Sequence, residues 1–138
     1  MVGLMKTLLW LDDIRNPYKD NWVKDFSPIG TDCLIYWVID YDGFCTYIKA
    51  NGLPDGICFD HDLGLPNHFK RVKEGISKTQ SKKLKPLEKT GYDCAKWLVD
   101  YCLDNKLALP LYNIQSSNPA GKENIDALLK NYIKYYNK

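Results

Sequence analysis

The residues of this chain that are best suited to chemistry form one triplet, Asp60-His61-Asp62. It directly follows a short apolar run at 56–59 and offers two carboxylates and one imidazole. Carboxylate oxygens are hard ligands for divalent cations, and an imidazole changes its charge near neutral pH. A tripeptide of this kind is common by chance, so its weight depends on whether other segments bring polar groups to the same place.

Two other apolar runs also end in polar residues, namely Asp12-Asp13 and Ser116-Ser117-Asn118. Because all strands of a parallel sheet point the same way, their carboxyl ends share one edge, where the three segments would meet. Crowded carboxylates repel one another unless a cation or a proton neutralises them. We therefore expect a Mg²⁺ or Mn²⁺ site, for which the predicted ligands are Asp12, Asp13 and Asp60.

The third segment predicts a phosphate site. Asn118 precedes Pro119, the pattern of a helix cap followed by the first helical residue. The free amides and the dipole of a helix N-terminus favour an anion. The predicted phosphate-binding residues are Arg15, Ser116, Ser117, Asn118 and Lys122. A metal site beside a phosphate site is a layout for phosphoryl chemistry.

Each motif also has a purely structural explanation. Asp12-Asp13 could form a turn or pair with Arg15, and Asp60 could cap a local turn while His61 bonds a backbone carbonyl. The Ser116-Ser117-Asn118 segment has the composition of a helix cap whether or not a ligand binds. Convergence of three separate segments on one edge favours the functional interpretation.

Alternating strands and helices must position these residues. Apolar runs predict strands at 7–11, 34–39, 56–59 and 109–115, of which the first two have the pattern of strands buried on both faces. Helices are predicted from Asp40 to Gly52, at 91–105 and after Asn118, with a helical turn near 22–26. This order predicts an α/β three-layer sandwich, with a short parallel sheet of about four strands and helices on both faces.

Length and composition indicate one domain over 1–138 in the cytoplasm. No apolar run is long enough to span a membrane, and the five cysteines contain no Cys-x-x-Cys pair, which is typical of reduced thiols.

The net charge is only +2, but residues 67–90 hold eight basic residues against two acidic ones. We expect this insertion to be flexible. It permits a nucleic-acid partner without indicating one, because no aromatic residues are interleaved with the charges. The oligomeric state stays open.

In type and order, the site residues resemble those of the receiver domains of two-component signalling. Receivers carry an acidic pair after the first strand, a phosphoacceptor aspartate after the third and a hydroxyl residue after the fourth, which Asp12-Asp13, Asp60 and Ser116 match. The chain departs from receivers in having no fifth strand with a lysine, although Lys122 could approach from the last helix.

Four ordered motifs resemble more specifically the cyclic-phosphate processing receiver-like family of bacteria and phages. They are Leu-Trp-Leu-Asp-Asp-Ile-Arg-Asn-Pro at 9–17, Phe-Asp-His-Asp-Leu-Gly at 59–64, Thr-Gly-Tyr-Asp at 90–93 and Ser-Ser-Asn-Pro-Ala-Gly-Lys-Glu-Asn at 116–124. Members often carry a histidine where Gln115 stands. The resemblance implies a receiver-like (flavodoxin-like) fold, the handling of cyclic phosphates, and a place in the cytoplasm of a bacterial cell or a phage-infected host.

Three functions are compatible with these residues. The leading hypothesis is a metal-dependent phosphoesterase acting on a cyclic phosphate or cyclic nucleotide, with Asp60, His61 and Asp62 as the catalytic group. In it His61 is a general base or acid, Asp62 a ligand or orienting group, and Asp60 a ligand or a nucleophile. The alternative is a protein that binds or sequesters a phosphorylated signalling nucleotide without cleaving it. The third is a phosphoacceptor receiver domain.

Overall fold

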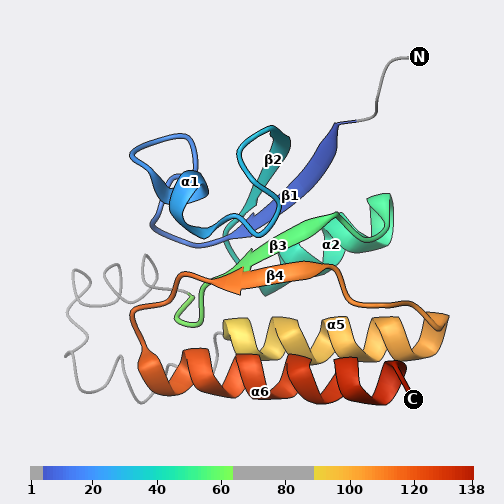
Figure 1. Cartoon of the computed structure of the whole chain (residues 1–138). Helices are drawn as coiled ribbons and strands as arrows, with labels where there is room; N and C mark the ends of the chain where they lie inside the picture. Colours follow the sequence, from blue (N-terminus) through green and yellow to red (C-terminus); the bar gives the residue numbers. More distant parts are fainter. Residues whose placement is uncertain (1–4, 64–88) are drawn as a thin grey trace.

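Four parallel strands form one sheet with the order β2-β1-β3-β4 (Figure 1). This computed structural model describes residues 5–63 and 89–138, so the predicted basic insertion at 67–90 lies almost entirely outside the described residues. The strands are β1 (Lys6–Leu11), β2 (Cys33–Val38), β3 (Gly56–Phe59) and β4 (Leu111–Ile114). The helices are α1 (Trp22–Phe26), α2 (Tyr41–Asn51), α5 (Gly91–Asn105) and α6 (Pro119–Tyr136).

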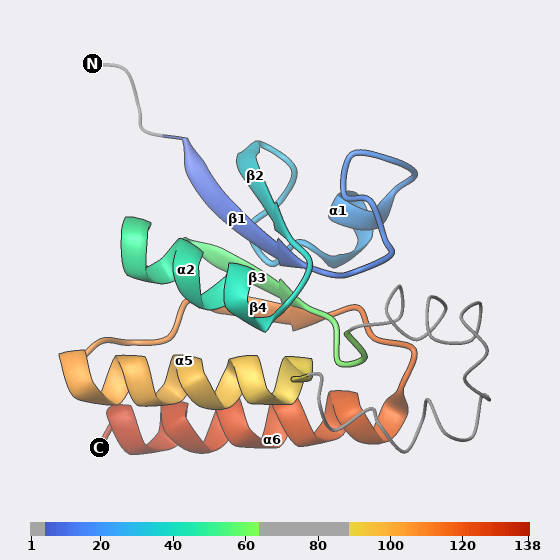
Figure 2. The same cartoon turned by 180° about the vertical axis from the view of Figure 1, so that it is seen from behind.

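The two faces of the sheet are covered unequally. Helices α2, α5 and α6 pack against one face, where Leu11, Phe59 and Ile114 belong to the larger core (Figures 1 and 2). The short helix α1 covers the other face, where Trp10 and Cys58 belong to a smaller core. The predicted α/β class, with a parallel sheet and helices on both faces, is confirmed.

The sheet ladder continues one residue beyond the ends of three strands. Asp12 N–H donates to Val38 O at 3.0 Å, Asp60 N–H to Leu11 O at 2.9 Å, and Gln115 N–H to Phe59 O at 2.9 Å. Asp12, Asp60 and Gln115 therefore stand side by side at the carboxyl edge, and we call them the polar row. Side chains alternate along a strand, so the polar row points away from the larger core and toward the α1 face.

Polar side chains begin the three long helices. Asp40 Oδ1 accepts from Gly43 N–H at 2.7 Å at the start of α2, and Asn118 Oδ1 accepts from Gly121 N–H at 2.9 Å at the start of α6. At α5, Thr90 and Asp93 form a reciprocal capping box. These caps explain why the helices begin where the sequence predicted them.

The expectation that the strand at 34–39 is buried on both faces was wrong. Among the described strands β2 pairs only with β1, and Leu34, Tyr36 and Trp37 are 46%, 43% and 38% exposed. An apolar run reports side-chain type but not the number of neighbouring strands, so it does not distinguish an edge strand from a central one. The fourth strand is also shorter than predicted; Pro110, which has no N–H to donate, immediately precedes it.

Two observations bear on the cellular setting. All five cysteines are free, and four of them are buried. None of the described helices is both long and apolar enough to cross a membrane.

The start of α5 lies directly against the chain that leaves β3. Gly91 N–H donates to His61 O at 2.8 Å, and a Cβ atom at Gly91 would lie 1.8 Å from the carbonyl oxygen of Asp60. The atoms nearest to this Cβ position belong to the backbone of Asp60 and His61, so they cannot rotate out of the way as a side chain could.

We predict that Gly91→Ala lowers the free energy of unfolding by more than about 2 kcal/mol, because α5 must move away from the Asp60-His61 peptide. Urea denaturation followed by circular dichroism measures the change. Lys96→Ala, at an exposed position of α5, is the control and should change stability by less than about 0.5 kcal/mol. Equal stability of the two variants would contradict the close approach of α5.

Candidate functional site

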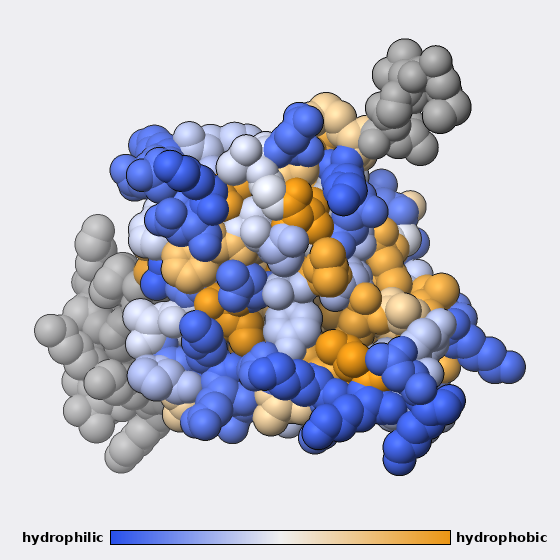
Figure 3. Space-filling view, viewed as in Figure 1, coloured by the Kyte–Doolittle hydropathy of each residue, from blue (hydrophilic) through white to orange (hydrophobic). Residues whose placement is uncertain are grey.

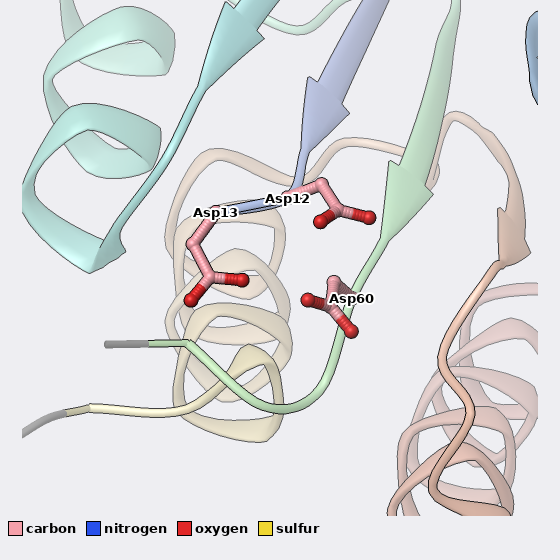
Figure 4. A group of neighbouring side chains, drawn as sticks. All are labelled: Asp12, Asp13 and Asp60. Carbon is pink, nitrogen blue, oxygen red and sulfur yellow. The ribbon is translucent and has the colours of Figure 1, made fainter. Parts of the chain in front are cut away.

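Three carboxylates meet at the carboxyl edge of the sheet. Asp12 and Asp13 follow β1 and Asp60 follows β3, and one oxygen of each lies within 4.8 Å of the others (Figure 4). Asp12 is fully buried and Asp60 is 4% exposed. We call these three residues the acid cluster. The sequence predicted this set from the acidic residues that follow two strands of the expected parallel sheet.

Crowding and burial change the protonation of Asp60. Burial first, and then the Asp12 carboxylate, raise its pKa from 3.8 to about 8; Arg15 opposes this shift and Asp13 adds to it. Without a cation, Asp60 therefore holds a proton at neutral pH and shares a hydrogen bond with Asp13. A divalent cation bound by the three carboxylates would offset their mutual repulsion, which is one cause of the raised pKa.

Arg15 supplies part of the missing positive charge. Its Nη1 lies 3.1 Å from Asp12 Oδ2 and 3.7 Å from Asp60 Oδ1, and its guanidinium stands over the ring of Trp22 in α1 at 5.4 Å from the ring centre. The structure thus shows the pairing of Arg15 with Asp12 that was one of the structural explanations. A role in phosphate binding remains a prediction.

Two tryptophans hold the loop that carries the acidic pair. Trp10 Nε1–H donates to Arg15 O at 2.9 Å, and Trp37 Nε1–H donates to Asp12 O at 2.8 Å. Asp12 Oδ1 in turn accepts from the amides of Ile14 and Arg15 at 3.0 and 2.9 Å. Asp12 is therefore both a turn residue and a member of the acid cluster. Sequence reasoning missed the tryptophans, because an indole N–H needs an acceptor but does not reveal which one.

The acid cluster could hold a metal ion. Its donors are carboxylate oxygens, which suit Mg²⁺ or Mn²⁺ better than soft metals. With its carboxylates ionised and Arg15 included, the cluster carries a net charge of −2, equal and opposite to that of a divalent cation. Because the loop at Asp12 is already fixed by hydrogen bonds, binding would require little ordering of the chain.

His61 lies in a second cluster, next to the first along the chain. Its Nδ1 is 2.9 Å from Asp62 Oδ1, and Asn118 Nδ2 donates to both oxygens of Asp62 at 3.3 and 3.4 Å. A carboxylate only accepts, so His61 Nδ1 carries the hydrogen of this contact, and Nε2 is the ring nitrogen left for proton transfer. Asp62 therefore orients the imidazole.

Helix α6 packs directly on the imidazole through Gly121. A Cβ atom at this position would lie 2.3 Å from His61 Cγ. Sequence analysis singled out neither Gly121 nor Gly91, although a signal exists. Both glycines lie in the first turn of a helix, where glycine is less favourable than alanine and so indicates a close contact.

The predicted phosphate site is only partly available. Gly121 N–H donates to Asn118 Oδ1 and Lys122 N–H to Asn118 O at 2.9 Å, while Pro119 has no N–H. Within the first turn of α6, this leaves the amide of Ala120. Ser116 Oγ accepts from Asn118 N–H at 3.1 Å, and Ser117 is exposed. The capping explanation of this segment is therefore correct, and phosphate binding remains a prediction.

Lys122 lines a groove of about 610 Å³ between β4 and α6, together with Tyr112 and Asp126. Figure 3 views this face and shows apolar surface above the hydrophilic residues of α6. The groove contains none of the acid cluster. The structure therefore does not group Lys122 with Asp12 and Asp60.

Gln115 is a further member of the site that sequence analysis did not assign a role. It is 3% exposed, and its Nε2–H donates to Leu11 O at 3.0 Å and to Asp12 Oδ2 at 3.3 Å. Its position directly after an apolar strand was the available signal. The family resemblance drew attention to the residue but not to this contact.

The raised pKa of Asp60 makes stability depend on pH in the metal-free protein. Between pH 4 and about 8 the folded protein keeps a proton that the unfolded chain has lost, so stability falls as the pH rises. We predict that Asp60→Asn removes this fall and makes the protein roughly 1–3 kcal/mol more stable than wild type at pH 8, with little difference at pH 4. Urea denaturation in EDTA across this range measures the effect.

Asp104→Asn, at an exposed position of α5, is the matched control and should leave the pH profile of wild type unchanged. If Asp60→Asn were less stable than wild type at pH 8, Asp60 would be ionised and satisfied without a cation.

Gly121→Ala should displace the imidazole of His61 while leaving the acid cluster in place, because the added methyl group overlaps the ring. We expect a shifted His61 ring resonance in NMR spectra, assigned with His61→Gln, and unchanged Mn²⁺ affinity. Ala120→Ser adds one heavy atom at the neighbouring exposed position and is the control. An unmoved His61 resonance in Gly121→Ala would contradict the packing of α6 on the ring.

Comparison with known proteins identifies the family. A family model described as "Cyclic-phosphate processing Receiver domain" matches residues 7–131. No curated protein and no solved structure matches the chain. The match spans both clusters, and the four-stranded parallel sheet with its helices agrees with a receiver-like fold. The chain belongs to the cyclic-phosphate processing receiver domain family.

Proposed function

We propose that the protein is a metal-dependent phosphoesterase that processes a cyclic phosphate or cyclic nucleotide. The observation that carries this proposal is the position of an aspartate-oriented histidine, His61, directly after Asp60 of the acid cluster. Family membership supports the substrate class. In this proposal the acid cluster binds the cation, and His61 with Asp62 transfers the proton.

The acid cluster would hold Mg²⁺ or Mn²⁺ through Asp12, Asp13 and Asp60. A bound divalent cation would neutralise phosphate charge and lower the pKa of a water molecule. Asp12 is held in place for this role by the amides of Ile14 and Arg15. The guanidinium of Arg15, already at the edge of the cluster, would supply positive charge to a phosphate oxygen.

His61 transfers the proton in this proposal. As water attacks, a new P–O bond forms and one P–O ester bond of the ring breaks, so the cyclic diester becomes a monoester. The proton of the attacking water moves to His61 Nε2 and from there to the leaving oxygen. Asp62 accepts the hydrogen bond from Nδ1–H throughout and stabilises the imidazolium. Ser116, Ser117 and the amide of Ala120 would bind phosphate oxygens.

A specific observation favours the second candidate, binding of a phosphorylated nucleotide without cleavage. Asn118 already uses two first-turn amides of α6, which limits stabilisation of charge in the transition state. The third candidate, a phosphoacceptor receiver, has less support. The described residues contain no fifth strand that would present a lysine, and Lys122 lines the β4–α6 groove.

We also infer that the protein works in the cytoplasm. Its five free cysteines fit a reducing compartment.

A screen of cyclic and linear nucleotides with Mn²⁺ or Mg²⁺, read by chromatography, tests the proposal. We predict turnover of a cyclic phosphate by wild type and a rate at least about 100-fold lower for His61→Gln, because the proton acceptor is lost. Mn²⁺ affinity, measured by calorimetry, should not change in His61→Gln. Asp60→Asn should lose both turnover and tight Mn²⁺ binding.

Each alternative has its own result. A ligand recovered intact after denaturation of its complex would favour the binding protein. Labelling by a small-molecule phosphodonor that is lost in Asp60→Ala would favour the receiver. Full hydrolysis by correctly folded Asp60→Asn would contradict the proposed role of the acid cluster.

A further inference from the structure

The carboxamide of Gln115 has a fixed orientation. Its nitrogen faces Leu11 O at 3.0 Å and Asp12 Oδ2 at 3.3 Å. Both partners can only accept, so the group facing them must be the NH₂ group and not the oxygen. The remaining polar atom of the side chain is Oε1.

Gln115 Oε1 is buried and receives no hydrogen bond from any residue in the described part of the chain. A buried acceptor without a partner costs about 1–3 kcal/mol. Buried polar atoms nearly always have a partner in folded proteins, and the exceptions concentrate at functional sites. Oε1 is therefore an acceptor that a bound ligand or its water could satisfy.

The hydrogen bond from Nε2 to Asp12 places the carboxamide of Gln115 at the edge of the acid cluster. β3 lies between β1 and β4, so Asp60 stands between Asp12 and Gln115 in the row. The carboxamide nevertheless reaches Asp12, two strands away from β4. A neutral oxygen adds an acceptor here without adding a fourth negative charge to carboxylates that already repel one another.

We propose that Gln115 is a positioning residue of the divalent-cation site. Its Nε2–H holds the carboxylate of Asp12, and its Oε1 accepts a hydrogen bond from a water molecule that hydrates Mg²⁺ or Mn²⁺. Mg²⁺ usually keeps several of its waters in proteins, and groups that hold metal ligands or their waters commonly change affinity 10- to 100-fold. The inference rests on the cation site of the proposed function and is independent of the reaction.

Mn²⁺ and Mg²⁺ binding to the full chain, without any nucleotide, tests this role. Gln115→Met keeps the length of the side chain but removes both polar atoms. We expect about tenfold weaker Mn²⁺ binding by calorimetry and a smaller rise in Tm on adding Mn²⁺. Asn113→Leu is the matched control, since this amide lies on the same strand but outside the polar row. Its oxygen already accepts from Ile114 N–H at 2.9 Å.

The outcomes separate this inference from the proposed function. Unchanged Mn²⁺ affinity in a folded Gln115→Met protein would overturn the inference and leave the phosphoesterase proposal standing. Weaker binding in Gln115→Met, with no hydrolysis by wild type, would support the inference and reject the phosphoesterase. No Mn²⁺ binding by wild type would overturn both. If Gln115→Met does not fold, Gln115→Leu, which also lacks polar atoms, takes its place with the same expected results.

Discussion

Repulsion among three crowded carboxylates, two of them buried, is the constraint on which the rest of the site depends. Asp12, Asp13 and Asp60 lie too close together to be ionised at once in a dry environment, and the raised pKa of Asp60 expresses this conflict. Without a cation, the guanidinium of Arg15 and one proton offset the negative charge of the carboxylates. A divalent cation would offset this charge more effectively. The fixed loop around Asp12 keeps the carboxylates from separating to relieve the strain.

The second cluster is built on a different principle, close packing of helix N-termini on the chain that leaves β3. Gly91 of α5 and Gly121 of α6 bring backbone against the Asp60-His61 segment, where any side chain would overlap. Packing thereby fixes the imidazole relative to the acid cluster, although its hydrogen bond is to Asp62. Hydrogen bonds position the acid cluster, whereas helix packing positions His61. A variant can therefore disturb one of the two clusters without the other.

The sequence predicted the order and type of the elements and the acid cluster, because strand ends follow from apolar patterning and parallel strands share an edge. It also predicted the caps at Asp40 and Asn118, which depend on local chemistry. It could not predict that Trp37 and Gln115 bond Asp12, or that β2 is so exposed. Those facts depend on which strands become neighbours, and patterning along one segment does not carry that information.

Changes in chain length between β3 and α5 need not disturb the edge of the sheet. His61 O accepts from Gly91 N–H at 2.8 Å, so the chain returns after thirty positions to the place it left. Closing a longer loop costs only a little more entropy. A change in the number of residues between the two joined ends would therefore cost little free energy while the edge of the sheet keeps its own contacts.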